Sequence, residues 1–304
     1  MSVAVLTLAH GRHDHLRGQI AGLAGGVRRP DLHVVAAIDD PDVARVAREA
    51  WDEHDRPDRP DPPAGPGAGP RPAPGAATPR LLVVEVEADP QGLPLALARN
   101  TAATTAVRHG AQTLVFLDVD CIPGPGTVET YADALAAPRD DAGPLVLGGD
   151  VAYLPPREQG WSNPAELVRL GEHRPDRVRL TAGEQRREPD LTRFWSLSFA
   201  TTAEDLQAVG GFCTDYVGYG GEDTDFGQLL GARGGRLVWV GGATAYHQHH
   251  PSSSPPVAHL AAVVRNAGVF ADRWGWWPME GWLEAFRRLG LAEQDRSGRW
   301  VVSG

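Results

Sequence analysis

Two groups of acidic side chains in this sequence have the types and spacing needed for chemistry. Asp118 and Asp120 stand two positions apart at the end of an apolar run, and Glu222 and Asp223 directly follow the glycine-rich segment 218–221. Paired carboxylates after a buried strand are typical ligands of a hard divalent cation. A carboxylate beside a flexible loop can accept a proton from a hydroxyl group.

Asp118 and Asp120 predict a site for Mn²⁺ or Mg²⁺, because these cations prefer oxygen ligands. A cation bound there would act as a Lewis acid and offset the charge that builds on a departing diphosphate. His247, just after the last predicted strand, offers an imidazole as a further ligand, whereas His249 and His250 are expected in an exposed polar loop. The alternative for the acidic pair is a loop or a helix N-cap that binds no ligand.

The glycine-rich segment predicts a loop that a substrate can approach closely, because glycine adopts positive φ values and carries no side chain. Asp223, placed against a sugar hydroxyl, would accept its proton as the oxygen attacks. The alternative is an N-cap carboxylate of the following helix, which suits one of Glu222, Asp223 and Asp225 but not all three. Together the two acidic groups indicate transfer of a group from a metal-bound diphosphate donor.

Other polar and aromatic residues are weaker candidates for binding. Asp39 and Asp40 could accept hydrogen bonds from a base or a ribose, or form part of a turn before Pro41. Arg99 could reach a nucleotide, or lie on a solvated helix face. The C-terminal tryptophans could stack on a sugar acceptor, although core packing or a helical lid is the favoured interpretation. These tryptophans are Trp274, Trp276, Trp277 and Trp282.

The elements that must position these residues alternate between strands and helices. This order predicts an α/β fold with a mostly parallel central sheet and helices on both faces. Ligands of such sheets lie beyond the carboxyl ends of the strands, which places Arg12, Asp39, Asp118 and Asp120 along one rim. The predicted strands are residues 2–9, 32–38, 81–86, 113–117, 145–153, 194–201 and 236–240, and the predicted helices are 16–23, 43–51, 95–109, 127–136, 203–209, 223–230 and a helical part within 257–291.

Composition narrows the class of protein. Hydrophobic residues make up 42% of the chain, which is enough to form a substantial core. The formal net charge of −10 argues against a general nucleic-acid binder. No apolar run approaches the roughly 18 residues that cross a bilayer, so we expect a cytoplasmic protein without a transmembrane segment. The Pro- and Gly-rich residues 56–80 are expected to be a disordered insertion in a domain of residues 1–250, followed by a helical extension of residues 251–304.

Three sequence motifs resemble those of GT-A glycosyltransferases of family 2, with a C-terminal half similar to galactosyltransferases and polypeptide N-acetylgalactosaminyltransferases. They are the opening segment 5–12, the spacing between Arg99 and the Asp-Val-Asp motif 118–120, and the Gly-Gly-Glu-Asp motif 220–223 followed by a strand and His247. The resemblance covers roughly residues 3–247. It implies the GT-A fold, a nucleotide-sugar donor that is usually UDP-linked, and a Mn²⁺ ion.

The resemblance also implies roles for individual residues. Asp120 would be the direct metal ligand and His247 the second protein ligand, with Asp118 near the donor ribose or sugar. Asp223 would be the general base of an inverting displacement. Arg12, Asp39 and Arg99 would line the nucleotide pocket, and Gly221 and Glu222 would meet the donor sugar or the acceptor.

The sequence departs from the family at two positions. Related galactosyltransferases have a tryptophan where Tyr219 stands, and their thioether metal ligand falls at Thr244. A nucleotidyltransferase acting on a sugar phosphate and a non-catalytic carbohydrate-binding scaffold remain alternatives. The acceptor can be a carbohydrate, a peptide, a lipid-linked sugar or a small molecule.

Overall fold

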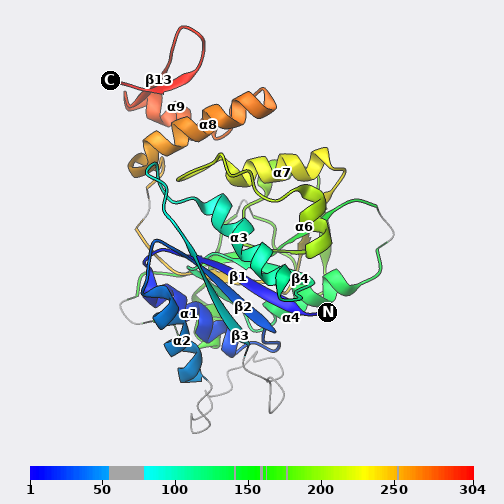
Figure 1. Ribbon diagram of the computed structural model, residues 1–304. Helices are drawn as coiled ribbons and strands as arrows, with labels where there is room; N and C mark the ends of the chain where they lie inside the picture. Colours follow the sequence, from blue (N-terminus) through cyan, green and yellow to red (C-terminus); the bar gives the residue numbers. More distant parts are fainter. Residues whose placement is uncertain (55–78, 140–141, 158–159, 162, 176, 252) are drawn as a thin grey trace.

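An eight-stranded sheet forms the centre of the molecule (Figure 1). The structure is a computed structural model that describes residues 1–304 except 55–78, 140–141, 158–159, 162, 176 and 252. The expected insertion at residues 56–80 therefore lies outside the described residues, apart from its last two positions. The strands, in spatial order, are β3 (Arg80–Val86), β2 (Leu32–Ile38), β1 (Val3–Ala9), β4 (Thr113–Leu117), β10 (Ser198–Thr202), β6 (Leu145–Gly148), β11 (Arg236–Val240) and β9 (Gln185–Glu188).

The sheet is mostly parallel, as the sequence predicts. Strands β3, β2, β1 and β4 are parallel, and β11 is parallel to β6. Strand β10 runs antiparallel to both β4 and β6, so that it begins at the edge of the sheet where β4 ends. The residues just before β10 therefore meet the residues that follow β4.

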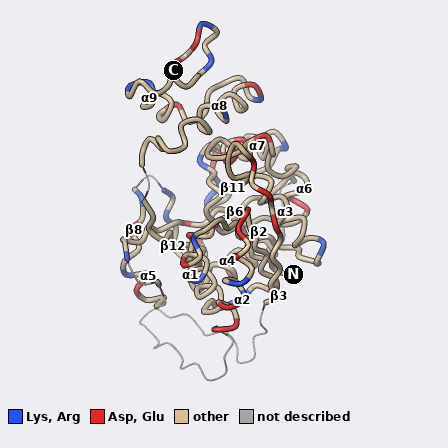
Figure 2. Tube along the Cα trace, turned by 60° about the vertical axis from the view of Figure 1, so that its left-hand side comes forward, with Lys and Arg blue, Asp and Glu red and all other residues tan. Residues whose placement is uncertain are grey.

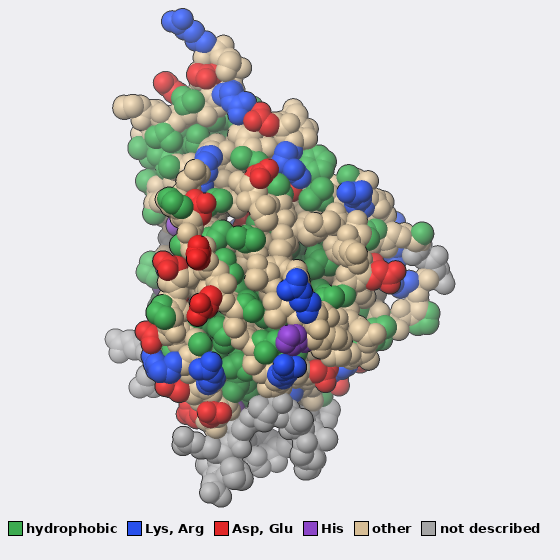
Figure 3. Space-filling view, viewed as in Figure 1, with side chains coloured by type: hydrophobic (Ala, Val, Ile, Leu, Met, Phe, Trp, Pro, Cys, Tyr) green, Lys and Arg blue, Asp and Glu red, His purple; other side chains and the backbone are tan. Residues whose placement is uncertain are grey.

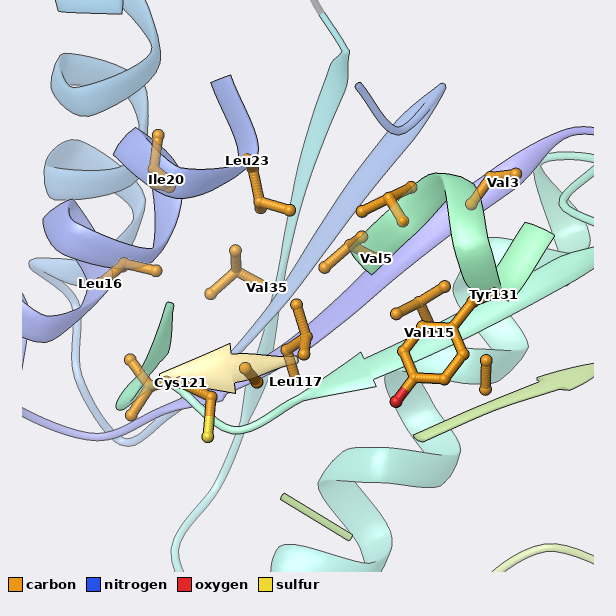
Figure 4. Packing of buried hydrophobic residues seen from close by; sticks show 14 of the residues in the cluster. Val3, Val5, Leu16, Ile20, Leu23, Val35, Val115, Leu117, Cys121 and Tyr131 are labelled. Carbon is orange, nitrogen blue, oxygen red and sulfur yellow. The ribbon is translucent and has the colours of Figure 1, made fainter. Parts of the chain in front are cut away.

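Helices cover both faces of the sheet because successive side chains of each strand point to opposite sides. In β1, Val3 and Val5 join one apolar cluster, and Ala4 and Leu6 join the other. Figure 4 shows the first cluster, in which side chains of β1, β2 and β4 pack together with those of one helical layer. That layer contains α1 (His13–Ala24), α2 (Val43–His54) and α4 (Thr127–Ala136), and the opposite layer contains α3 (Leu95–Arg108), α6 (Ala203–Val209) and α7 (Glu222–Ala232).

A second, four-stranded sheet stands beside the first, and the sequence did not predict it. The single strand expected at residues 145–153 is wrong, because the chain leaves the central sheet after Gly148 and β7 joins the smaller sheet. In that sheet His247 pairs with Cys121, which brings His247 next to Asp120. Its strands are β5 (Cys121–Pro123), β12 (Ala245–His247), β7 (Val151–Tyr153) and β8 (Glu172–His173).

The C-terminal part has an apolar cluster of its own, which includes Val263, Leu283, Phe286 and Trp300. Figures 1 and 2 show this part beyond α7, at one end of the molecule. Two helices lie within the residues where the sequence predicted a helical extension, and a closing hairpin that was not predicted follows them. The elements are α8 (Leu260–Trp274), α9 (Glu280–Arg288), β13 (Ala292–Gln294) and β14 (Trp300–Val302), and the remaining short elements of the chain are α5 (Pro164–Leu170), η1 (Leu191–Arg193) and η2 (Val257–His259).

Surface charge and helix length bear on possible partners. On the face in Figure 3, acidic and basic side chains are interspersed and no broad basic patch is visible. Nucleic-acid binders gather Lys and Arg on one surface, and this face shows no such gathering. The formal net charge of the chain is −10. Among the described residues, none of the helices combines the length and the apolar character needed to cross a bilayer.

Candidate active site

A cleft of about 570 Å³ opens at the rim where the parallel strands end. Its lining includes Arg12, Arg99, Asp118, Tyr219 and His250. Arg12 and Asp118 come from loops that the sequence placed at this rim, Arg99 comes from α3, and the last two come from the glycine-rich loop and from the segment after β12. The cleft thus lies where ligands of open α/β sheets bind.

Asp120 meets two histidines at the edge of this cleft. Its Oδ1 lies 3.7 Å from Nε2 of His247, and its Oδ2 lies 3.3 Å from Nε2 of His250. One ligand atom from each of the three residues lies within 4.8 Å of the other two, a spacing suited to one shared cation. The predicted convergence of Asp120 and His247 is therefore present in the structure.

His250 corrects the expectation that it lies in an exposed loop. The chain turns back after β12, so His249 is exposed while His250 is partly buried against Asp120. The spacing from His247 to His250 could have indicated a pair of metal ligands. The loop conformation that brings His250 to Asp120 depends on tertiary packing, which the sequence does not show. Thr244, where the family has a thioether ligand, instead accepts hydrogen bonds at its carbonyl from Gly124 and Thr127.

The charges around Asp120 favour its ionised form. Burial alone would raise the pKa of Asp120, but the hydrogen bond with His250 and the charges of His247 and Arg12 lower it below its usual value. The Arg12 guanidinium donates to Asp120 Oδ2 at 2.9 Å. Desolvation lowers the pKa of His247, which favours the neutral imidazole that a cation requires, whereas the hydrogen bond to Asp120 raises the pKa of His250.

Arg99 occupies a buried position between the two acidic groups. Its side chain is only 4% exposed, which rules out the solvated helix face considered from the sequence. Its guanidinium lies 3.4 Å from Asp118 Oδ1 and 3.5 Å from Glu222 Oε1. Burial and repulsion from Asp223 raise the pKa of Glu222 to about 7, and burial also raises the pKa of Asp118. Arg99 therefore links the acidic turn after β4 to the start of α7.

Asp223 has one carboxylate oxygen held and the other free. Its Oδ2 accepts a hydrogen bond from the backbone N–H of Ser196 at 3.1 Å. Its Oδ1 is buried and has no hydrogen-bond partner among the described residues. Because the N–H of Asp118 donates to the carbonyl of Leu197, the residues before β10 contact both acidic groups. A buried, unpaired carboxylate oxygen is unusual and suits a group that receives a proton.

At the start of α7, Gly221 and Asp225 have structural roles. Gly221 precedes the helix with φ 94°, and a Cβ on it would lie 2.9 Å from the ring of Tyr216, so this position requires glycine. Asp225 is fully buried and accepts hydrogen bonds from Tyr216, Arg273 and Trp274. It therefore docks α8 onto α7 and takes no part in the cleft.

The two aspartates after β2 differ in their contacts. Asp39 adopts φ 46° and is exposed beside Ile38, which lines the cleft. Asp40 instead accepts hydrogen bonds from the backbone N–H of Gly11 at 2.7 Å and from His13, whose Nε2 lies 2.9 Å away. The sequence offered both aspartates as candidates for binding a base or a ribose, and in the structure Asp40 supports the loop that carries Arg12.

Aromatic side chains from the C-terminal part reach the cleft. The ring of Tyr219 stacks on His259 with 4.7 Å between centroids and on Trp282 with 5.9 Å. His259 also lines the cleft. Trp282 therefore supports a residue of the glycine-rich loop in addition to packing in its own cluster. The sequence offered no signal for His259.

Known proteins share this architecture. The sequence model described as the N-terminal domain of galactosyltransferase matches residues 178–251. S. aureus TarS in complex with UDP-GlcNAc superposes with a TM-score of 0.54 at 12% identity, covering 90% of this chain and 66% of that one. A mannosyltransferase from Pyrobaculum calidifontis, in complex with GDP-Man and Mn²⁺, gives a TM-score of 0.51 at 17% identity, covering 95% and 70%. The chain has the GT-A fold, as the motifs led us to expect.

Sequence relatives point in the same direction. The chain is 32% identical over 238 residues to validoxylamine A glucosyltransferase of Streptomyces hygroscopicus subsp. jinggangensis, covering 64% of this chain and 53% of that protein. The protein of the same name from subsp. limoneus is also 32% identical, with 49% of its length covered. This chain thus spans about half the length of these relatives, and the resemblance to GT-A glycosyltransferases is confirmed.

Proposed function

We propose that this protein is a metal-dependent, inverting glycosyltransferase that moves a hexose from a UDP-linked donor to an acceptor hydroxyl. The observation that carries the proposal is the arrangement at one rim of the sheet. A candidate cation cluster contains Asp120, and Arg99 contacts both the neighbouring Asp118 and Glu222, which precedes the carboxylate with an unpaired oxygen. The names of the relatives and the UDP-GlcNAc complex of TarS support the choice of donor.

The cation cluster fits a divalent transition metal. Asp120, His247 and His250 offer one carboxylate and two imidazoles. This mixed oxygen and nitrogen set favours Mn²⁺ over Mg²⁺, which prefers oxygen ligands. When bound, the cation would neutralise charge on the diphosphate of the donor. Arg12, already beside Asp120, supplies a second positive charge close to the same phosphates.

The remaining residues of the rim are assigned to the donor. Asp39, at the end of β2, would accept hydrogen bonds from the base or the ribose. Asp118 would bind a hydroxyl of the ribose or the sugar, held by Arg99, which is itself buried next to the nucleotide pocket. Gly221 and Glu222, at the start of α7, would meet the donor sugar or the acceptor, and Glu222, with a pKa near 7, can donate a hydrogen bond in the protonated form.

Asp223 is assigned as the general base. The acceptor oxygen attacks the anomeric carbon, its proton passes to Asp223 Oδ1, and the bond from that carbon to the diphosphate oxygen breaks. The Ser196 N–H fixes the other carboxylate oxygen and therefore orients the free one. A single displacement of this kind inverts the configuration at the anomeric carbon. Validoxylamine A, which appears in the names of the relatives, is the first acceptor to test.

The proposal is tested by incubating the protein with nucleotide sugars and Mn²⁺ and identifying the products. A glycosyltransferase releases UDP, whereas a nucleotidyltransferase forms or breaks the bond within the diphosphate. Asp120→Ala is expected to abolish Mn²⁺-dependent UDP binding in calorimetry. Asp223→Asn is expected to keep that binding and lose turnover. Wild-type affinity in the first variant, or wild-type kcat in the second, would contradict the corresponding assignment.

A further inference from the structure

A chain of hydrogen bonds runs through the interior from α2 to the acidic turn after β4. Trp51 Nε1 lies 3.1 Å from His33 Nδ1, and His33 Nε2 lies 3.1 Å from the Thr7 hydroxyl. Thr7 donates to Gln19 Oε1 at 2.7 Å. The side-chain amide of Gln19 then donates to the carbonyls of Asp118 at 2.8 Å and Cys121 at 3.1 Å.

The donors and acceptors along this series of hydrogen bonds match at every link. The indole of Trp51 can only donate, so Nδ1 of His33 accepts and its Nε2 carries the proton that Thr7 accepts. Burial lowers the pKa of His33 to about 3, which keeps this ring neutral. Thr7, Gln19 and His33 are fully buried. A satisfied polar network in a low-dielectric interior is rigid, and breaking one link leaves its neighbours unpaired.

We propose that Gln19 is a positioning residue for the turn of residues 118–121, held by the buried chain through Thr7, His33 and Trp51. Gln19 grips the two carbonyls that flank Asp120 in sequence, and the N–H of Cys121 closes the turn onto the carbonyl of Asp118 at 2.8 Å. The direction of the Asp120 carboxylate toward the two histidines thus depends on a network that touches no ligand. The link to donor binding rests on the proposed function.

Thr7→Val tests the network, because it keeps the shape of the side chain and removes the link between His33 and Gln19. Thr201→Val is the matched control, since Thr201 is equally buried and its hydroxyl donates to the carbonyl of Leu145 at 2.7 Å, away from the turn. Hydrogen exchange of the amides in residues 118–121, measured without ligands, is expected to rise roughly tenfold or more in Thr7→Val and to stay unchanged in Thr201→Val. Equal exchange in the two variants would overturn the proposal.

A second measurement connects the turn to the ligand. Thr7→Val is expected to weaken the affinity for UDP with Mn²⁺ by roughly 10- to 100-fold, the usual size of outer-shell effects, while Thr201→Val keeps wild-type affinity and Thr7→Ser restores it. If Thr7→Val does not fold, Gln19→Met is measured in the same way. Wild-type protein that does not bind UDP with Mn²⁺ would sink the proposed function alone, because the exchange experiment still decides the role of Gln19.

Discussion

At the scale of single residues, His249 and His250 form a natural comparison. They are neighbours in sequence, but only His250 lies against Asp120. We expect His250→Ala to lower the affinity for Mn²⁺ by at least roughly tenfold, since it removes a proposed direct ligand and even outer-shell changes have effects of this size. His249→Ala should bind Mn²⁺ as the wild type does. Calorimetric titration of both variants measures the difference, and equal affinities would remove His250 from the metal site.

Glu222 predicts a dependence of stability on pH. Its pKa of about 7 in the folded protein lies above the ordinary value of 4.5, so the folded protein binds more protons between these pH values. Raising the pH through this window should therefore lower the free energy of unfolding, by up to about 3 kcal/mol for this group. Glu222→Gln should reduce the slope when unfolding is followed from pH 4.5 to 8 with a chelator present, and Asp118, whose pKa burial also raises to about 7, should account for the slope that remains.

The control for this experiment is Glu293→Gln, which changes an exposed carboxylate on β13. That variant should keep the slope of the wild type. A wild-type slope in Glu222→Gln as well would show that another group is responsible for the pH dependence.

Residue types and strand ends were enough to place Asp120 at one rim with Arg12, Asp39 and Asp118, because parallel strands end on the same side of a sheet. Residue types and family motifs added Arg99, His247 and Asp223 to the site. They were not enough for His250 or His259. The position of each histidine depends on how a loop packs against the cleft, and no local sequence pattern predicts that packing. The contacts of Asp40 with Gly11 and His13 could not be predicted for a related reason, since these partners lie on a different loop.

At the scale of elements, the docking of α8 onto α7 depends on Asp225. This fully buried carboxylate accepts hydrogen bonds from Arg273 and Trp274 of α8 at 2.7 Å each. Asp225→Asn should destabilise the protein by about 2–4 kcal/mol, because it leaves Arg273 without its charged partner. Arg299→Ala, which removes an exposed ion pair with Asp272 in the same part of the chain, should leave the melting temperature unchanged.

Thermal unfolding followed by circular dichroism measures both variants. A melting temperature of Asp225→Asn equal to that of Arg299→Ala would mean that α8 is held mainly by its apolar contacts. Because Asn266 of α8 also donates to the carbonyl of Gly220 at 2.8 Å, loosening α8 should reach the glycine-rich loop as well.

The central strands and most helices could be predicted closely, since long apolar runs bounded by turn residues are local signals. Strands β2, β4 and β11 begin and end where the sequence indicates. The smaller sheet could not be predicted, because β5, β7 and β12 are three residues each and are defined by their partners. The closing hairpin follows the same rule, since β13 and β14 are as short and pair only with each other.

At the scale of the whole molecule, ligand binding should appear as added stability. A ligand that binds only the folded state raises the free energy of unfolding by about 2.7 kcal/mol at about 100 times its Kd. UDP and Mn²⁺ together should raise the melting temperature more than the sum of their separate effects, since in the proposed site the cation would bind both the protein and the diphosphate. Asp120→Ala should lose this surplus, and a surplus that persists would place the cation elsewhere.

The antiparallel direction of β10 has a consequence for how the two proposed sites are held relative to each other. Ser196 and Leu197 are consecutive, and one holds the proposed base while the other holds the turn of the proposed metal ligand. Successive Cα atoms are about 3.8 Å apart whatever the surroundings. The proposed base and the turn of the proposed metal ligand are therefore anchored to adjacent backbone residues, so a movement of this segment should shift both together.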